Sequence, residues 1–126
     1  MKTNCLSVEV VNIDHKLSLF NDYWSPKIVG RLNDHKVQLA KLKGEFVWHH
    51  HDNEDELFLV IKGKLIIHFS DRTIVVNEGE LVVIPHPVEH KPEAPEEVHI
   101  LLIEPENVLN TGNISSKRTV IKQEKI

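Results

Sequence analysis

Short apolar segments separated by polar or glycine-containing turns run through most of the chain. The segments cover residues 27–32, 36–42, 45–51, 56–61, 65–69, 73–76, 81–84 and 98–103. Their spacing, roughly 8–12 residues with no longer helical period between them, is typical of β-sandwiches and barrels. The pattern therefore predicts an all-β fold with eight or more short strands.

The two ends of the chain follow this pattern less closely. Asp14 is placed to cap a short helix over residues 14–20, in which Leu17 and Phe20 are three positions apart. Residues 114–126 are basic, which indicates a solvated tail, although the run 119–121 also permits a strand that pairs with a partner subunit. We predict one domain over residues 1–126, with an N-terminal arm (1–26), a barrel core (27–104) and a C-terminal tail (105–126).

Composition narrows the possible functions. The formal net charge is −4, which provides no basic face for general nucleic-acid binding. The single cysteine, Cys5, excludes an internal disulfide and a cysteine-rich zinc site. We expect no membrane association, because no apolar run is long enough to span a bilayer and the first residues do not resemble a signal peptide. A cytoplasmic location is expected on the same grounds.

The chain contains nine histidines, and three of them are consecutive at positions 49–51. On a strand, His49 and His51 project from one face and His50 from the other. Glu56 begins the next apolar segment after a short acidic loop, so a tight hairpin returns its carboxylate to the two imidazoles. Two nitrogens and one oxygen suit Fe(II), Mn(II), Ni(II), Co(II) or Zn(II). The alternative is a polar rim of histidines beside a solvated loop.

A second segment, residues 79–90, runs from a glycine turn through a buried strand to a histidine. Pro85 and Pro87 restrict the backbone before His90. A stiff turn after a buried strand aims a side chain inward. Taken alone, His90 is better explained as an ordinary surface histidine.

Together the two segments resemble the motifs of the cupin superfamily, specifically its small single-domain, cupin 2 type members. The resemblance covers residues 36–104, with 15 residues (64–78) between the motifs. It departs from the family pattern in the spacing before His49 and at Pro87 and Ala94. The first motif corresponds to Gly44, His49, His51, Glu56 and Gly63, and the second to Gly79, Pro85 and His90.

The resemblance implies a double-stranded β-helix (jelly-roll) barrel with a short N-terminal helix or arm. It also implies that His49, His51, Glu56 and His90 bind one divalent transition metal: Fe, Mn, Ni or Zn. One or two octahedral positions would stay open for water or substrate. Candidates for the ligand pocket are Phe58 and Val60, which share the strand parity of Glu56, and His99 on the last strand.

Cupins include dioxygenases, decarboxylases, isomerases and non-catalytic binders, so the fold alone does not select a function. We expect a metal-dependent enzyme acting on a small oxygenated organic substrate, which predicts a charged or hydroxylic pocket group besides the metal ligands. The alternative is a metal-containing binding or sensor module, which predicts an apolar pocket without such a group. A purely structural metal predicts a closed coordination shell and no cavity.

The expected partners are a small-molecule ligand and a second copy of the chain. Small β-barrels have exposed edges that are costly to leave open, and small cupins commonly pair. We therefore expect a homodimer in which the terminal segments cross between subunits.

Overall fold

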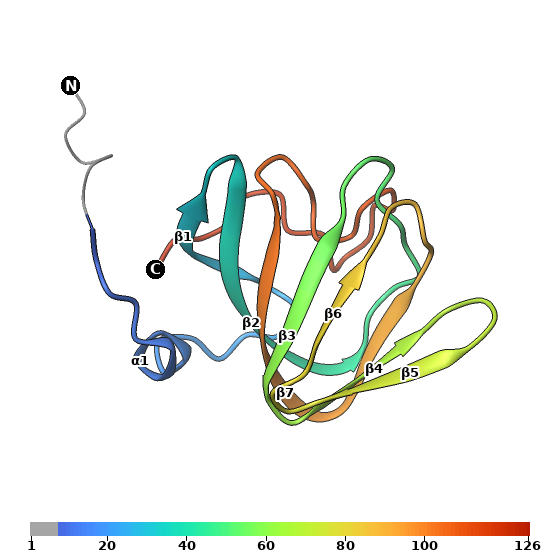
Figure 1. Ribbon diagram of the computed structural model, residues 1–126, viewed down its shortest axis with the longest axis horizontal. Helices are drawn as coiled ribbons and strands as arrows, with labels where there is room; N and C mark the ends of the chain where they lie inside the picture. Colours follow the sequence, from blue (N-terminus) through green and yellow to red (C-terminus); the bar gives the residue numbers. More distant parts are fainter. Residues whose placement is uncertain (1–7) are drawn as a thin grey trace.

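A computed structural model describes residues 8–126, and in this part of the chain it contains one short helix and seven strands. The strands form an antiparallel sheet in the order β1-β2-β7-β3-β6, and β4 pairs with both β5 and β7 (Figure 1). Their bounds are α1 Ile13–Leu17, β1 Lys27–Leu32, β2 His35–Glu45, β3 Glu56–Lys62, β4 Lys64–His68, β5 Thr73–Asn77, β6 Leu81–Ile84 and β7 Lys91–Pro105.

β3, β4 and most of β7 alternate buried and more exposed side chains, whereas β2 is buried without a break over residues 38–42. The all-β prediction is confirmed. One apolar core fills the barrel and takes residues from every strand except β1; it contains Trp24, Ala40, Leu42, Phe46, Phe58, Val60, Leu65, Ile67, Val76, Ile84, Ala94, Val98, Ile100 and Leu102. Within the described residues, no helix has the length or apolar character needed to cross a membrane.

The predicted helix exists but is shorter and starts earlier than expected. It covers Ile13–Leu17, and its N-cap is Asn12, whose side chain accepts a hydrogen bond from His15 N at 2.9 Å. Asp14 instead lies in the first turn, where its charge complements the helix dipole. Leu17 packs with Phe20 and Leu39, so the helix covers one end of the outer sheet surface.

The prediction of a strand over residues 45–51 is wrong. β2 ends at Glu45, after Gly44 with φ +86° shifts the register of its ladder with β7. Beyond that point His50 pairs with the C-terminal tail: its amide donates to Asn113 Oδ1 at 2.8 Å, and its carbonyl accepts from Asn113 N at 3.0 Å. A single bridge between His49 and His90 is the only sheet-like pairing within residues 46–55.

The last strand is longer than the predicted 98–103. β7 begins at Lys91 and includes Pro92 and Pro95, which in the sequence argue against a strand. The structure accommodates Pro95 because the ladder with β2 breaks between Ala94 and Val98. The residues between these two positions lie outside that ladder, so no sheet hydrogen bond is lost at the proline.

The C-terminal tail packs on its own barrel, so the prediction of a solvated tail is wrong. Ile28 N donates to Glu124 O at 2.9 Å, and Ile126 N donates to Ile28 O at 3.0 Å. Lys27, which is only 2% exposed, forms an ion pair with Glu124 at 2.6 Å. The tail therefore runs beside β1 of the same chain, and the C-terminus lies next to that strand (Figure 1).

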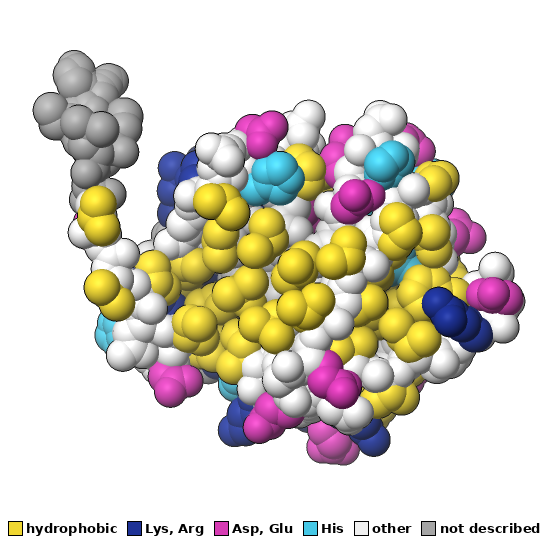
Figure 2. Space-filling view, viewed as in Figure 1, with side chains coloured by type: hydrophobic (Ala, Val, Ile, Leu, Met, Phe, Trp, Pro, Cys, Tyr) yellow, Lys and Arg dark blue, Asp and Glu magenta, His cyan; other side chains and the backbone are white. Residues whose placement is uncertain are grey.

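The outer surface of the sheet is strongly apolar. Figure 2 shows hydrophobic side chains gathered over β2, β7, β3 and β6. Cross-strand pairing aligns them in rows. One row runs across β2, β7, β3 and β6 and consists of Leu39, Leu101, Leu59 and Leu81. We call this surface the outer apolar face; it contains Val37, Leu39, Leu57, Leu59, Leu81, Val83, Leu101 and Ile103.

Two glycines with positive φ provide a stability test. A Cβ at Gly63 (φ +92°) would lie 2.9 Å from Glu97 O, whereas a Cβ at Gly79 (φ +82°) would meet open space. Gly79→Ala should lower the free energy of unfolding by about 1 kcal/mol through backbone strain alone. Gly63→Ala should lower the free energy of unfolding by about 1 kcal/mol more than Gly79→Ala, because the backbone at Glu97 must also move. Urea denaturation measures both, and equal losses would contradict this explanation.

Candidate metal centre

Two segments that are far apart in the sequence meet inside the barrel and bring their histidines together. His49 and His90 exchange backbone hydrogen bonds of 3.0 and 2.9 Å, and their ring centroids lie 4.4 Å apart. His49 is 1% exposed and His90 is 0% exposed. The bridge thus fixes the two imidazoles side by side, although they are 41 positions apart in the sequence.

Glu56 lies at the first position of β3, and its carboxylate completes the group. Its two oxygens each approach one imidazole: Oε2 is 3.2 Å from His51 Nε2, and Oε1 is 3.2 Å from His90 Nε2. One ligand atom from each of His49, His51 and Glu56 can be chosen so that all lie within 4.8 Å of one another. His90 lies outside this group of three but contacts Glu56, so all four predicted metal ligands are buried close together.

The histidine rings are oriented by backbone carbonyl oxygens. His49 Nδ1 donates to Val47 O at 2.9 Å, and His90 Nδ1 donates to Val88 O at 3.0 Å. Because a carbonyl oxygen only accepts, each Nδ1 carries a proton, and the lone pair of the neutral ring is on Nε2. An imidazole held in this way is the usual arrangement of a metal-ligating histidine.

Burial and charge act on the protonation of this cluster. Burial and the neighbouring His90 lower the pKa of His49 to about 4, so this ring is neutral at ordinary pH. Burial also acts to lower the pKa of His51, but its interaction with the Glu56 carboxylate outweighs burial and raises it. Burial opposes ionisation of Glu56, yet the His51 and His90 imidazoles, each 3.2 Å away, lower the pKa of that carboxyl.

The donor set fits a divalent metal ion. His51 Nε2 is buried and lies near Glu56, but it forms no well-aligned hydrogen bond. A buried polar atom without a hydrogen-bond partner is costly, and a cation bound among these side chains would satisfy it. Three imidazole nitrogens and one carboxylate oxygen suit Zn(II) and the first-row metals from Mn(II) to Ni(II).

A small apolar cavity of about 30 Å³ adjoins the cluster. His49 and Glu56 reach its wall, and Trp24 and Phe46 stack there with ring centroids 4.7 Å apart. The only other polar side chain in the lining is Asn110, whose amide is occupied by Arg118 O at 2.8 Å and Val120 N at 2.8 Å. The lining comprises Trp24, Pro26, Ala40, Leu42, Phe46, His49, Glu56, Phe58, Pro92, Ile100, Leu102 and Asn110.

The pocket candidates occupy different places. Phe58 lines the cavity, while Val60, 0% exposed, lies in the core beyond it. His99 does not line the cavity, which corrects the expectation for this residue. Its neighbours Val98 and Ile100 point into the core, so by alternation His99 lies on the opposite sheet surface, where Nε2 contacts Glu97 at 2.6 Å.

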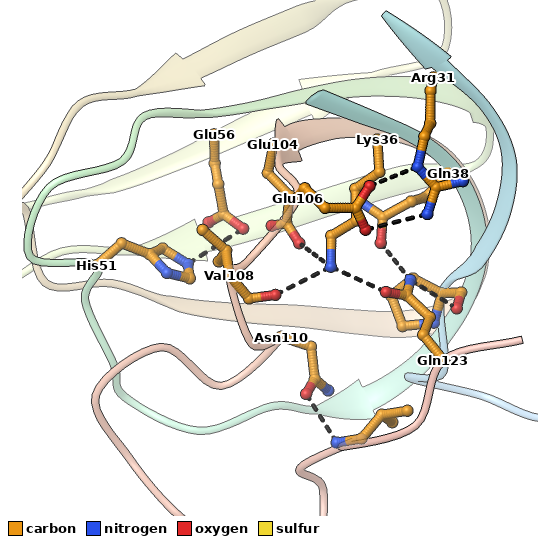
Figure 3. Close-up of polar contacts among 12 residues, drawn as sticks. Arg31, Lys36, Gln38, His51, Glu56, Glu104, Glu106, Val108, Asn110 and Gln123 are labelled. Atoms are coloured by element: carbon orange, nitrogen blue, oxygen red, sulfur yellow. Dashed lines mark hydrogen bonds and ion pairs between the residues drawn. The ribbon is translucent and has the colours of Figure 1, made fainter. Parts of the chain in front are cut away.

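Sequence reasoning missed a buried polar network behind the cluster. Glu104 is 2% exposed and lies beside Glu56, with Lys36, Gln38 and Gln123 extending the network toward the tail (Figure 3). Burial and the charge of Glu56 raise the pKa of Glu104, and Lys36 offsets them only in part. Strand parity could have indicated Glu104, because it continues the inward series of β7 that includes Ile100 and Leu102.

Comparisons with known proteins agree with this architecture. A family profile described as a cupin domain matches residues 36–104. A cupin-2 domain containing protein from Shewanella frigidimarina NCIMB 400 is 50% identical, with a TM-score of 0.75 over 76% of this chain and 94% of that one. Protein NMB1881 from Neisseria meningitidis is 31% identical, with a TM-score of 0.71 over 77% and 99%. These matches confirm the predicted cupin jelly-roll fold.

A curated relative is matched over a shorter length. The uncharacterized protein YdbB from Bacillus subtilis (strain 168) is 42% identical over 64 residues, which are 50% of this chain and 57% of that protein. The chain therefore matches little more than half of the length of this relative.

Proposed function

The chain belongs to the cupin family, and on that premise we propose that it binds one divalent transition metal and a small organic ligand beside it. The observation that carries the proposal is the buried cluster of His49, His51, Glu56 and His90 at the wall of an apolar cavity. A bound metal would supply Lewis-acid polarisation of a ligand oxygen. His49 and Glu56 reach both the cluster and the cavity, so a ligand held there would contact the metal.

The cavity wall favours a binding or sensor module over an enzyme with its own acid–base group. Besides the two metal ligands, no charged or hydroxylic side chain occurs in the lining formed by the described residues, and the Asn110 amide is already engaged. The wall suits a ligand with an apolar body and one metal-binding oxygen group. Because the cavity itself has a volume of only about 30 Å³, wall side chains must move to admit a ligand larger than about one or two water molecules. Phe46 and Phe58 would exclude water around it.

A metal-dependent enzyme is the second candidate. Three imidazoles and one carboxylate would leave octahedral positions open on a bound metal, and His49 and Glu56 both reach the cavity wall. In this case all of the chemistry would depend on the metal, and the chain would supply only orientation and exclusion of water. Oxidoreductase, decarboxylase and isomerase activities are the reaction classes to screen.

Elemental mass spectrometry of untagged protein tests the proposal. We expect about one equivalent of Fe, Mn, Ni or Zn per chain. Loaded protein would then be offered small carboxylates and diketones, with oxygen consumption and product formation followed alongside ligand binding. Binding without turnover would support the module, and turnover would support the enzyme. Protein that neither contains nor takes up a metal would overturn both.

Metal affinity should weaken as the pH falls below the raised pKa of His51. The ring must lose its proton to bind a metal, so one proton competes and the affinity should fall about tenfold per pH unit in this range. His49 has a pKa of about 4, so a proton does not compete with the metal for this ring until the solution is far more acidic. Competition titrations between pH 5 and 8 measure the slope, and a flat profile would contradict the assignment.

The metal-free protein should respond to pH in the opposite direction. A histidine whose pKa is raised by folding stabilises the folded state below its unfolded pKa of about 6.5, and this contribution is lost as the pH rises through the folded value. In urea denaturation of metal-free protein, the contribution of the His51–Glu56 pair to the free energy of unfolding should therefore decrease as the pH rises over the same range. Metal affinity should increase over that range.

The same proposal includes a homodimer formed through the outer apolar face. Leu81 and Val83 are 58% and 50% exposed on this sheet surface, and an apolar surface of this kind is typical of a protein contact. Val8 and Val10 of the N-terminal arm are 95% and 98% exposed, so the arm is available to cross to a partner subunit. The cytoplasm is the proposed compartment, on the single cysteine of the sequence.

A further inference from the structure

We propose that Glu104 is a positioning residue for the Glu56 ligand and that Lys36 connects it to the C-terminal tail. The inference rests on the proposed metal binding and assigns a role to buried side chains that do not line the cavity. The network is drawn in Figure 3, where the Glu104 carboxyl lies between the Glu56 carboxyl and the Lys36 amine.

The carboxyl groups of Glu56 and Glu104 are buried neighbours. Their residues are 3% and 2% exposed, and Figure 3 draws the Glu104 carboxyl beside that of Glu56. The oxygens of Glu56 also approach His51 and His90 at 3.2 Å. In Figure 3, Glu104 lies on the side of Glu56 opposite His51, where its bulk and charge would limit rotation of the carboxylate. Ligating carboxylates are normally oriented by neighbouring polar groups of this kind.

Lys36 holds Glu104 in turn. The two residues are cross-strand partners on β2 and β7, and Lys36 Nζ lies 3.8 Å from Glu104 Oε2. Lys36 is 5% exposed, and its amine also donates to Val108 O and Gln123 Oε1, both at 2.9 Å. Two acids buried side by side require a compensating charge, and Lys36 is the cation that supplies it.

The tail completes the network through Gln123. Its side-chain amide donates to Pro26 O at 2.9 Å and also hydrogen-bonds Gln38, which is 0% exposed. Gln38 Nε2 and Glu104 Oε1 are both buried without a hydrogen-bond partner, so this part of the network is not satisfied by its own side chains. Contacts made by the tail are thus transmitted through Lys36 and Glu104 to a metal ligand.

A purely structural ion pair is the competing explanation, and it makes a different prediction. Replacing a buried ion pair changes folding stability, sometimes by little, but does not alter how Glu56 meets a metal. The discriminating measurement must therefore report coordination geometry as well as stability. Co(II) added to metal-free protein serves as the probe, because its visible absorption responds to ligand number and geometry.

The variants are Glu104→Gln, which keeps a polar side chain of the same shape, and Glu104→Leu, which removes the polar group. Glu106→Gln and Glu106→Leu are matched controls, since Glu106 lies two residues further along, 46% exposed, and bonds Arg31 at 2.5 and 3.0 Å. We expect Glu104→Leu to weaken Co(II) binding about 10- to 100-fold and to change the spectrum. Glu104→Gln should restore the spectrum and most of the affinity, and both controls should match the wild type.

Each outcome decides a separate point. Wild-type protein that binds no Co(II) would overturn the proposed metal site itself. Normal wild-type binding with an unchanged spectrum and affinity in Glu104→Leu would overturn the positioning role, as would equal losses in Glu104→Leu and Glu104→Gln. If Glu104→Leu does not fold, Lys36→Met decides instead: it should change the Co(II) spectrum, and a wild-type spectrum in that variant would refute the proposal.

Discussion

Replacing His49 by alanine is expected to abolish stoichiometric metal binding, whereas replacing its neighbour His50 is expected to leave it unchanged. His49 is 1% exposed and faces Glu56 and His90, while His50 points outward and bonds Asp52 Oδ1 at 2.9 Å. Both variants remove an imidazole from the same tripeptide. Any difference between them therefore reports which face of the chain binds the metal.

The expected loss in His49→Ala exceeds 100-fold. Removing a residue that only orients a ligand typically costs about 10- to 100-fold in metal affinity, and His49 is proposed as a ligand itself. Its pKa of about 4 means that no proton must be displaced near neutral pH, so the ring contributes its full donor strength. The alanine variant would also leave a cavity next to Phe46, whose ring lies 5.3 Å from that of His49.

Metal content after purification and Co(II) titration of metal-free protein measure the effect. The loss must be accompanied by a folded metal-free variant, which circular dichroism and urea denaturation would verify. Equal retention in both variants would exclude His49 as a ligand. Equal loss in both would indicate that the tripeptide contributes through its backbone or through the adjacent acidic loop.

Alternation along strands explains why much of the site could be predicted from the sequence. Glu56 and Phe58 lie on one side of β3 because side chains on a strand alternate, and both reach the cavity. His49 and His51 also share a side, although the segment that carries them is not a strand. On β7 the same alternation separates His99 from the core and points Glu104 toward it.

Contacts between distant segments explain what could not be predicted. The irregular course of residues 46–55 depends on Asn113, which pairs with the backbone of His50 from the tail. Docking of the tail depends on the buried Lys27 and Lys36, both of which appear in the sequence as ordinary surface-type residues. Local propensity contains no information about such pairs. A buried charge is tolerated only when it is paired with a partner group, and here the partner comes from a distant part of the sequence.

The second large effect is expected at the outer apolar face. The double substitution Leu81→Glu and Val83→Glu should convert a dimeric protein to a monomer, while Val75→Glu should leave the dimer intact. Val75 and Val83 are each 50% exposed, so they are matched in residue type and exposure. Val75 lies on β5, which pairs only with β4 and does not form part of this face.

The physical reason is the symmetry of such a contact. In a two-fold dimer the same surface meets itself, so each substitution places charges on both sides of the interface. Burying unpaired carboxylates there costs several kcal/mol, and about 3 kcal/mol corresponds to a more than 100-fold weaker dimer. The folded monomer should be little affected, because Leu81 and Val83 are already at least half exposed in a single chain.

Light scattering coupled to gel filtration, at several protein concentrations, measures the mass directly. Two results would contradict different parts of the argument. A monomeric wild type would refute the dimer, and a dimeric double variant would move the contact to another surface. A monomeric Val75→Glu variant would instead assign the contact to the β4–β5 hairpin. Because the metal cluster lies inside the barrel, metal content should be the same in the monomeric and dimeric forms, which separates this interface from the site.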